Sequence, residues 1–244
     1  MCGRFTFHDT PEEIIASLDG LNVDCTGLEP FEPCYNVAPT TYAPTVAGGD
    51  TPTAGLRRWG LVPHWAKDPS IGNRMINARG ETVAEKPAFR NLVAKQRCVV
   101  PANGYYEWGK NGAPAGGRRG KIPYYIRSPQ YRVLWFAGLH AKWFSADDKR
   151  LDTYTIITTQ PAAAIADIHD RMPVILSRDG IEQWLRTDRG DPAEALSLLR
   201  PYNGELEAYA VSQLVNSPRN NSPLCIEPAA AADDADDLLP GLSR

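Results

Sequence analysis

The sequence predicts an α+β fold: a single domain with a curled, barrel-like and mostly antiparallel β-sheet flanked by short helices. The first observation is that many short segments rich in β-branched and aromatic residues follow one another between turn-forming residues. The second is that helical segments do not alternate regularly with them, as a doubly wound parallel sheet would require. With 244 residues, 43% of them hydrophobic and 23% charged, the chain is long enough for one large domain with its own core.

The chain begins with a predicted strand and a capped helix. Residues 3–7 have the composition of a short strand. Thr10 then suits a helix N-cap, Pro11 the first helical position, and Glu13 the last residue of a capping box. A proline-rich connection follows, and its segment 35–40 has neither helical nor strand periodicity. We expect this segment to form a rigid loop of the kind that often binds ligands.

A hairpin and a broken helix are expected next. Residues 48–50 (Gly-Gly-Asp) mark a hairpin turn, and the strand after it runs through 56–62. Apolar residues within 82–95 recur at helical spacing, but Pro87 interrupts them. Because proline lacks a backbone N–H and clashes with the preceding turn, we expect the helix to be broken there.

The second half of the chain is predicted to be rich in strands. Its strand-like segments are 97–101, 104–108, 123–126, 133–139, 154–158, 174–176 and 206–211. Short helices are expected at 161–168, after the cap Ser177, and at 192–199 after the cap Asp191. The glycine-rich, basic segment 110–121 is expected to be a loop.

Composition and motifs exclude several classes of protein. The net charge of −3 argues against a general nucleic-acid binder, which usually carries a basic excess. No apolar run reaches transmembrane length and no signal peptide opens the chain. We therefore expect a cytoplasmic protein without a membrane partner, associated with the nucleoid if bacterial. The five cysteines include no Cys-x-x-Cys pair, and no metal-ligand or nucleotide-binding motif occurs, so neither a metal nor a cofactor is expected.

Cys2 would become the N-terminal residue if Met1 were removed. Its thiol and its α-amine would then lie on adjacent carbons. An amine condenses with an aldehyde to a Schiff base, and the neighbouring thiol can close onto the imine carbon to form a five-membered thiazolidine. An N-terminal cysteine can also act as a nucleophile with its own amine as the nearby base. The alternative is that Cys2 has no function, since the reactivity of a cysteine depends on its surroundings.

Two titratable residues are candidates for acid–base chemistry. Glu107 lies in a predicted strand between Tyr106 and Trp108, where a buried carboxylate must be paired, neutral or functional. The alternative is that strand alternation simply turns Glu107 toward water. His169 has charged residues directly after it, which suits a proton shuttle near neutral pH. The alternative for His169 is a surface histidine at a helix end.

Polar and aromatic loop residues are candidates for contacts with nucleic acid. Asn77 and Arg79 are two residues apart and share one face if the chain is extended there, which suits a phosphate or a sugar edge. Trp65 and Pro39 offer flat apolar faces for base stacking. The alternatives are loop hydrogen bonding for Asn77 and core packing for Trp65.

Six segments carry a resemblance when they are taken together and in order. They are 1–5 (MCGRF), 35–40 (YNVAPT), 59–63 (WGLVP), 76–82 (INARGET), 104–108 (GYYEW) and 168–173 (IHDRMP). In this order they resemble the SRAP (SOS response-associated peptidase) family. The resemblance covers about residues 2–227, which we expect to be the SRAP domain, while the Ala/Asp-rich tail 228–244 is expected to be disordered.

The resemblance implies a function in the DNA damage response. Such a protein binds single-stranded DNA at abasic sites and links covalently to the ring-opened sugar as a thiazolidine of Cys2, which shields the lesion. It implies a self-processing peptidase, which removes Met1, and a lyase-like crosslinking activity. Asn77 would hold the reacting sugar or the amine, and Glu107 would deprotonate the α-amine. His169 would promote opening of the sugar ring and proton transfer.

The resemblance also implies DNA contacts of two kinds. Three arginines would hold phosphates and three other residues would wedge against bases: Arg4, Arg79 and Arg171, and Asn36, Pro39 and Trp65. Two other readings stay open: an amide-cleaving enzyme with Cys2 as its N-terminal nucleophile, and a single-stranded DNA-binding protein that forms no covalent bond. The preferred DNA structure, the oligomeric state and protein partners at the replication fork are not fixed by the sequence.

Overall fold

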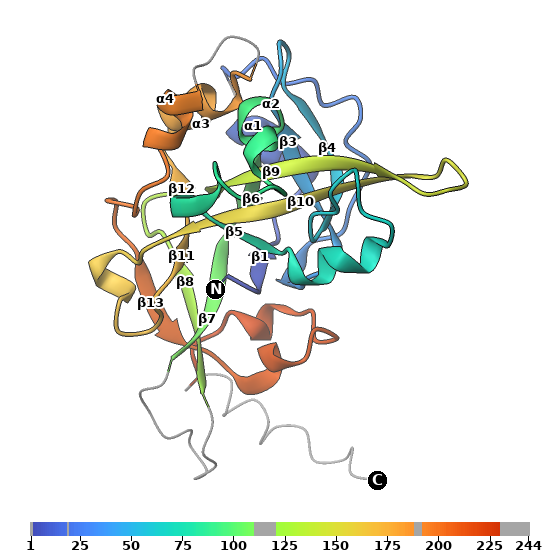
Figure 1. The fold of residues 1–244 in the computed structure, drawn as a ribbon. Coiled ribbons are helices and arrows are strands. Elements are labelled where there is room, and N and C mark those ends of the chain that lie inside the picture. Colours follow the sequence, from blue (N-terminus) through green and yellow to red (C-terminus); the bar gives the residue numbers. More distant parts are fainter. Residues whose placement is uncertain (1, 19, 110–120, 188–191, 230–244) are drawn as a thin grey trace, which may run out of the picture.

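A closed β-barrel with a second sheet beside it forms the body of the protein in the computed structural model, which describes residues 2–18, 20–109, 121–187 and 192–229 (Figure 1). Five strands close the barrel because β10 hydrogen-bonds to both β4 and β9. They are, in spatial order, β10 (Arg150–Thr159), β4 (Thr53–Trp59), β3 (Tyr42–Ala47), β6 (Arg97–Ala102) and β9 (Leu134–Phe144). Three short strands extend this sheet: β5 (Asn77–Arg79), β11 (Met172–Pro173) and β12 (Ile175–Leu176).

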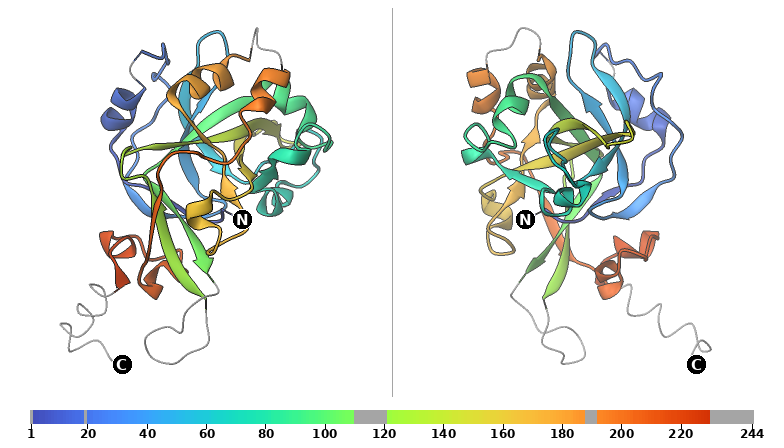
Figure 2. Two further views of the ribbon diagram at one scale, coloured as in Figure 1. Left: turned by 90° about the vertical axis from the view of Figure 1, so that its left-hand side faces the viewer. Right: turned by 45° about the vertical axis from the view of Figure 1, so that its right-hand side comes forward.

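The second sheet brings the N-terminus to the barrel. Its order is β13 (Glu207–Ala210), β8 (Ile122–Arg127), β7 (Gly104–Gly109), β1 (Phe5–Phe7) and β2 (Cys34–Val37). Since β6 and β7 are separated by Asn103 alone, one run of chain supplies a strand to each sheet. Figure 2 shows β7 and β8 extending away from the barrel, with the segment that holds η4 (Gln213–Asn216) and η5 (Pro223–Cys225) beside them.

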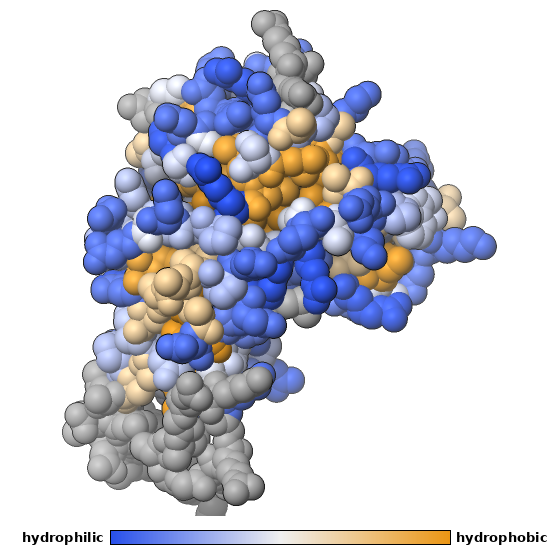
Figure 3. Space-filling view, turned by 60° about the vertical axis from the view of Figure 1, so that its left-hand side comes forward, coloured by the Kyte–Doolittle hydropathy of each residue, from blue (hydrophilic) through white to orange (hydrophobic). Residues whose placement is uncertain are grey.

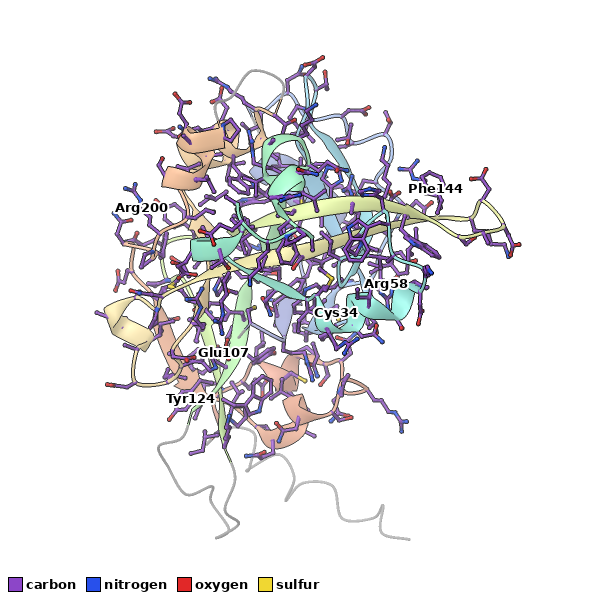
Figure 4. All side chains as sticks on the ribbon, in the orientation of Figure 1. Cys34, Arg58, Glu107, Tyr124, Phe144 and Arg200 are labelled. Atoms are coloured by element: carbon purple, nitrogen blue, oxygen red, sulfur yellow. The ribbon has the colours of Figure 1, made fainter. Side chains whose placement is uncertain are left out.

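The predicted fold class is confirmed, with parallel pairings as local exceptions. Most strand pairs are antiparallel, but β10 runs parallel to β4 and to β5. The hairpin of β9 and β10 is long and projects beyond the barrel, and Phe144 near its tip is 52% exposed (Figure 4). Among the described residues, no helix is both long and apolar enough to cross a bilayer.

Two strands lie where the sequence predicted only a proline-rich connection. β2 occupies part of the predicted loop 35–40, and β3 contains Pro44. Pro44 pairs with Leu56 of β4, whereas β6 pairs only with the last two residues of β3. At Pro44, β3 has no second neighbouring strand, so the missing proline N–H costs no hydrogen bond there. The proline is therefore tolerated within the strand.

The short helices begin where their caps were predicted. In α1 (Pro11–Ser17) the capping box forms, with Thr10 N–H donating to Glu13 Oε2 at 2.8 Å and Glu13 N–H to Thr10 Oγ1 at 3.3 Å. Ser177 caps α3 (Arg178–Leu185) by accepting from the Gly180 N–H at 3.2 Å. The remaining helices are α2 (Arg90–Lys95), η1 (Pro69–Arg74), η2 (Gly80–Thr82), η3 (Ala163–Ile165) and α4 (Pro192–Ser197).

Two helix predictions need adjustment. The expected broken helix over 82–95 forms a regular helix only as α2, after Pro87. The predicted helix 161–168 shrinks to the single 3-10 turn η3, because Ile165 is its one fully buried side chain and a longer helix would gain little packing. The predicted cap Asp191 and most of the predicted loop 110–121 lie outside the described residues.

Aromatic side chains fill the core between the two sheets. Phe5 packs edge-on against Trp59 and Phe136, with ring centroids 5.2 and 6.2 Å away. Trp59 stacks on Tyr154, and Tyr105 packs edge-on against Phe136. Because Phe5 is central to this cluster, the residues just before it are held at the junction of the sheets. Figure 3 shows that hydrophilic residues cover much of one outer face, with apolar surface gathered in patches.

Candidate active site

Cys2 lies buried where β1, β5 and β7 meet, near the N-terminus marked in Figure 1. The pairing of Phe5 with Tyr105, and a hydrogen bond of 3.0 Å from Tyr106 N–H to Arg4 O, align the N-terminal residues with β7. Asn77 Nδ2 of β5 donates to Cys2 O at 2.8 Å. The backbone of Cys2 is therefore fixed from two sides. Met1 lies outside the described residues.

Glu107 and His169 form an acid–base pair beside Cys2, with Glu107 buried and His169 partly buried. Glu107 Oε2 and His169 Nε2 are 3.6 Å apart, and the Glu107 side chain is almost fully buried. Figure 4 labels Glu107 on β7, next to Tyr124 of β8. Burial raises the pKa of Glu107 from 4.5 to about 7, and the nearby Asp170 carboxylate acts in the same direction. The alternative in which Glu107 faces water is wrong.

The hydrogen bonds of His169 indicate which ring nitrogen carries the proton. The Arg171 backbone N–H donates to His169 Nδ1 at 3.0 Å, so Nδ1 acts as an acceptor. The neutral ring then holds its proton on Nε2, facing Glu107. Asp170 Oδ1 also lies 3.0 Å from Nδ1, but its side chain is highly exposed and water can replace it. Partial burial lowers the pKa of His169, which favours this neutral ring near pH 7.

An open cleft begins beside Asn77. The Asn77 Oδ1 atom is buried and has no hydrogen-bond partner within the described ranges. The cleft has a volume of about 610 Å³ and joins apolar walls to two basic side chains. Its lining residues are Trp65, Asn77, Arg79, Thr82, Lys86, Pro87, Ala88 and Phe89. Trp65 is 55% exposed and Arg79 is exposed, so both offer surface to a bound molecule.

Arg4 and Asn36 hold the segment that contains η4. Arg4 Nη1 donates to Asn36 Oδ1 at 2.6 Å and to Val215 O at 2.9 Å. Asn36 Nδ2 donates to the carbonyls of Ser217 and Asn220 at 2.9 and 2.8 Å, and Asn36 is only 2% exposed. In this structure the Asn36 side chain is therefore not available to stack against a base. Pro39, the neighbouring wedge candidate, is half-buried at the surface.

Arg171 is held by an ion pair. Its Nη1 and Nη2 atoms contact the two carboxylate oxygens of Glu81 at 2.7 and 2.9 Å, and Nη2 also donates to Thr158 O at 2.7 Å. This bidentate pair fixes the strand end that follows His169. Any phosphate contact of Arg171 would add to these bonds or replace them.

Comparison with known proteins decides the family. The model of a family described as SOS response associated peptidase (SRAP) matches residues 1–218. The chain belongs to the SRAP family. It is 46% identical over 230 residues to the abasic site processing protein YoqW of Bacillus subtilis, covering 93% of this chain and 99% of YoqW.

More distant relatives and a solved structure also match most of the chain. The abasic site processing protein HMCES of Rattus norvegicus is 32% identical over 274 residues, covering 94% of this chain and 76% of HMCES. A crystal structure of a protein from Bacteroides thetaiotaomicron superposes with a TM-score of 0.80 at 27% identity, covering 93% of this chain and all of that one. The resemblance found in the sequence is thereby confirmed.

The structure brings the four predicted catalytic residues of this SRAP protein, Cys2, Asn77, Glu107 and His169, into one connected group. Arg79 and Trp65 line the adjoining cleft, while Arg4, Asn36 and Arg171 are engaged in contacts within the protein. The sequence analysis assigned no role to Tyr105 and Tyr154, whose buried phenols interact electrostatically with the Cys2 thiol. Tyr105 lies in segment 104–108, which carries the family resemblance, but neither residue was assigned a role because aromatic residues in strands are most often core residues. Two other cleft residues were missed: Lys86 belongs to no motif, and Phe89 was interpreted only as part of the helical apolar spacing within 82–95.

Proposed function

We propose that this protein binds single-stranded DNA at abasic sites and traps the ring-opened sugar aldehyde as a thiazolidine of Cys2, once Met1 has been removed. The supporting observation is that Cys2 is fixed by Asn77 beside a buried carboxyl group paired with a partly buried imidazole. The family, and relatives named abasic site processing proteins, support the same substrate. Covalent capture would shield the lesion from strand cleavage.

Glu107 is suited to activate the α-amine. An α-amine has an ordinary pKa of about 8 and attacks an aldehyde only in its neutral form. Burial raises the pKa of Glu107 to about 7, so the two groups exchange a proton with little energetic cost near neutral pH. The amine then adds to the aldehyde carbon, and the proton held by Glu107 can leave with the carbinolamine hydroxyl as water. This returns Glu107 to its ionised form and leaves the imine protonated on nitrogen.

His169 and Asn77 are suited to open and hold the sugar. The Nε2–H of neutral His169 can donate a hydrogen bond to the ring oxygen as the hemiacetal opens to the aldehyde, and the proton of the anomeric hydroxyl ends on that oxygen. The Oδ1 of Asn77, which has no partner among the described residues, can accept a hydrogen bond from a sugar hydroxyl or from the α-amine, since Nδ2 already binds Cys2 O. Asn77 would thus set the distance between the amine and the reacting carbon.

The cleft beside Asn77 suits the DNA that flanks the lesion. Trp65 offers an exposed ring for stacking of an unpaired base. Arg79 and Lys86 add positive charge along the same cleft. Arg4 and Arg171 would support the strand from within their existing contacts, and Pro39 would press on a neighbouring base. With so few basic side chains, the affinity should depend only modestly on salt.

We also propose that the protein removes Met1 itself. The aminothiol cannot form while Met1 blocks the nitrogen of Cys2, so processing must precede capture. A cysteine thiol beside an acid–base pair is the arrangement that an amide-cleaving nucleophile requires. If the protein processes itself, Cys2→Ala produced without a methionine aminopeptidase should retain Met1, while the unaltered chain should not.

A crosslinking gel tests the proposal. The protein is mixed with an oligonucleotide that carries one abasic site, heated in denaturant and separated by size. We expect one heat-stable adduct per oligonucleotide with the unaltered protein and none with Cys2→Ala. Cys25→Ala, which changes a cysteine away from the site, serves as the matched control and should crosslink normally. An equal adduct from Cys2→Ala would rule the proposal out, and glutamine hydrolysis without an adduct would favour the amide-cleaving alternative.

A further inference from the structure

Tyr105 carries a buried hydroxyl that the proposed chemistry has not used. Its side chain is 0% exposed, and within the described part of the chain the hydroxyl has no hydrogen-bond partner. An unpaired buried hydroxyl costs about 1–3 kcal/mol, so its presence in a folded protein needs a reason. The ring itself is fixed, because it packs edge-on against Phe136 at a centroid distance of 5.9 Å.

The geometry of β7 turns this hydroxyl toward the reacting groups. Tyr105 and Glu107 are two residues apart in β7, so their side chains point to the same face. The pairing of Tyr105 with Phe5 brings the preceding residues, including Cys2, alongside that face. The phenol interacts electrostatically with both the Cys2 thiol and the Glu107 carboxyl. It therefore lies within electrostatic range of both the proton donor and the proton acceptor of the reaction, while among the described residues its hydroxyl is bonded to neither of them in the resting structure.

Closure of the thiazolidine ring requires a proton to leave the thiol. The sulfur bonds to the carbon of the protonated imine, the π electrons of its C=N bond move to the positively charged nitrogen, and the S–H bond must break. Burial raises the pKa of the Cys2 thiol well above its ordinary value, and the side chain is fully buried. The thiol is thus protonated in the resting protein, and bulk water is not at hand to accept its proton.

We propose that Tyr105 relays the thiol proton to Glu107 during ring closure. As the S–C bond forms, the phenol oxygen accepts the proton of the thiol and the phenol donates its own proton to the Glu107 carboxylate. The phenol ends as it began, Glu107 ends neutral, and the former imine ends as a neutral ring amine. This role rests on the proposed function and deepens it, because Glu107 then serves both the amine step and the thiol step.

Tyr105→Phe tests the relay, with Tyr154→Phe as its matched control. Tyr154 is also fully buried, and within the described residues its hydroxyl is also unpaired. Its phenol interacts with the thiols of Cys98 and Cys2 rather than with Glu107. Both substitutions remove one unpaired hydroxyl and keep the ring, so both variants should fold. If the thiol proton is relayed to Glu107, only Tyr105→Phe should slow ring closure.

The two chemical steps are measured separately on an abasic oligonucleotide. Borohydride reduces the Schiff base to a stable amine, whereas the thiazolidine survives heat without borohydride. For Tyr105→Phe we expect Schiff base formation at the normal rate, ring closure slowed by about tenfold or more, and accumulation of the borohydride-dependent species. Tyr154→Phe should match the unaltered protein. Ring closure in the unaltered protein should also slow measurably in D2O, a readout that needs no variant.

Each outcome decides a separate question. If Tyr105→Phe closes the ring at the normal rate, or if both variants slow it equally, the relay is wrong while the proposed function stands. A D2O rate equal to the rate in H2O would also overturn the relay. If the unaltered protein forms no heat-stable adduct, the proposed function itself fails.

Discussion

Glu107→Gln removes the carboxylate on which both proton transfers depend, while its amide keeps the size of the side chain. General acid–base catalysis typically contributes about 10²–10⁴ in rate, which corresponds to roughly 3–5 kcal/mol of activation free energy. We therefore expect the variant to crosslink at least about a hundredfold more slowly near pH 7.5. The affinity for uncrosslinked abasic DNA should change little, because Glu107 is buried and does not line the cleft. Single-turnover gels and fluorescence anisotropy measure the two quantities.

The same substitution has a pH-dependent effect on stability. Burial raises the pKa of Glu107 from 4.5 to about 7, so the folded state holds this proton more tightly than the unfolded chain does. The free energy of unfolding therefore falls as the pH rises from about 4.5 to about 7. At 1.36 kcal/mol per pK unit, the ionised carboxylate costs on the order of 3 kcal/mol above that window. Glu107→Gln avoids this cost, and its Tm at pH 8 should exceed that of the unaltered protein by up to roughly 10 °C.

Comparing the Tm of Glu107→Gln with that of the unaltered protein separates the contribution of Glu107 from that of its titratable neighbours. His169, Asp170 and Lys121 also act on this site, but they are present in both proteins. The Tm difference should shrink toward zero as the pH is lowered to 4.5. Glu12→Gln, at an exposed position in α1, is the matched control and should show no such trend. A normal crosslinking rate in Glu107→Gln, or a Tm difference independent of pH, would refute the reasoning.

Three further substitutions separate DNA binding from folding. Trp65→Ala should weaken binding to abasic single-stranded DNA by about 1–3 kcal/mol in anisotropy titrations, with an unchanged Tm, if the exposed ring is the proposed stacking surface for a base. Arg79→Gln should reduce the slope of log K against log salt by about 0.7, as one phosphate contact is lost; an unchanged slope would exclude that contact. Asn36→Leu should lower the Tm in thermal unfolding, because the carbonyls of Ser217 and Asn220 lose their donor at about 1–3 kcal/mol each. A normal Tm for Asn36→Leu would show that this loop is held by other contacts.

Local signals in the sequence were read correctly where short-range chemistry sets the structure. Thr10 and Glu13 form their capping box, and Ser177 caps its helix, because these contacts depend only on residues within one turn. The β3 strand was missed because Pro44 normally argues against a strand. Pro44 is tolerated because β6 pairs only with the end of β3, and this pairing of distant segments cannot be inferred from the local sequence.

The candidate site could be predicted only in part. Periodicity left the direction of Glu107 open, since both faces of β7 are buried: Tyr106 packs with Tyr125 and Val215, and Tyr105 in the main core. A period of two distinguishes faces only when one of them meets water. The burial of Asn36 and the ion pair of Arg171 join distant segments, so residue type alone could not reveal them.

Intact mass spectrometry of the adduct tests the central claim most directly. The account predicts a species equal to the chain without Met1 plus one abasic oligonucleotide minus one water, because thiazolidine formation expels one water. The species should survive heat without borohydride and be absent for Cys2→Ala. An adduct that retains Met1, or an identical adduct from Cys2→Ala, would contradict the account.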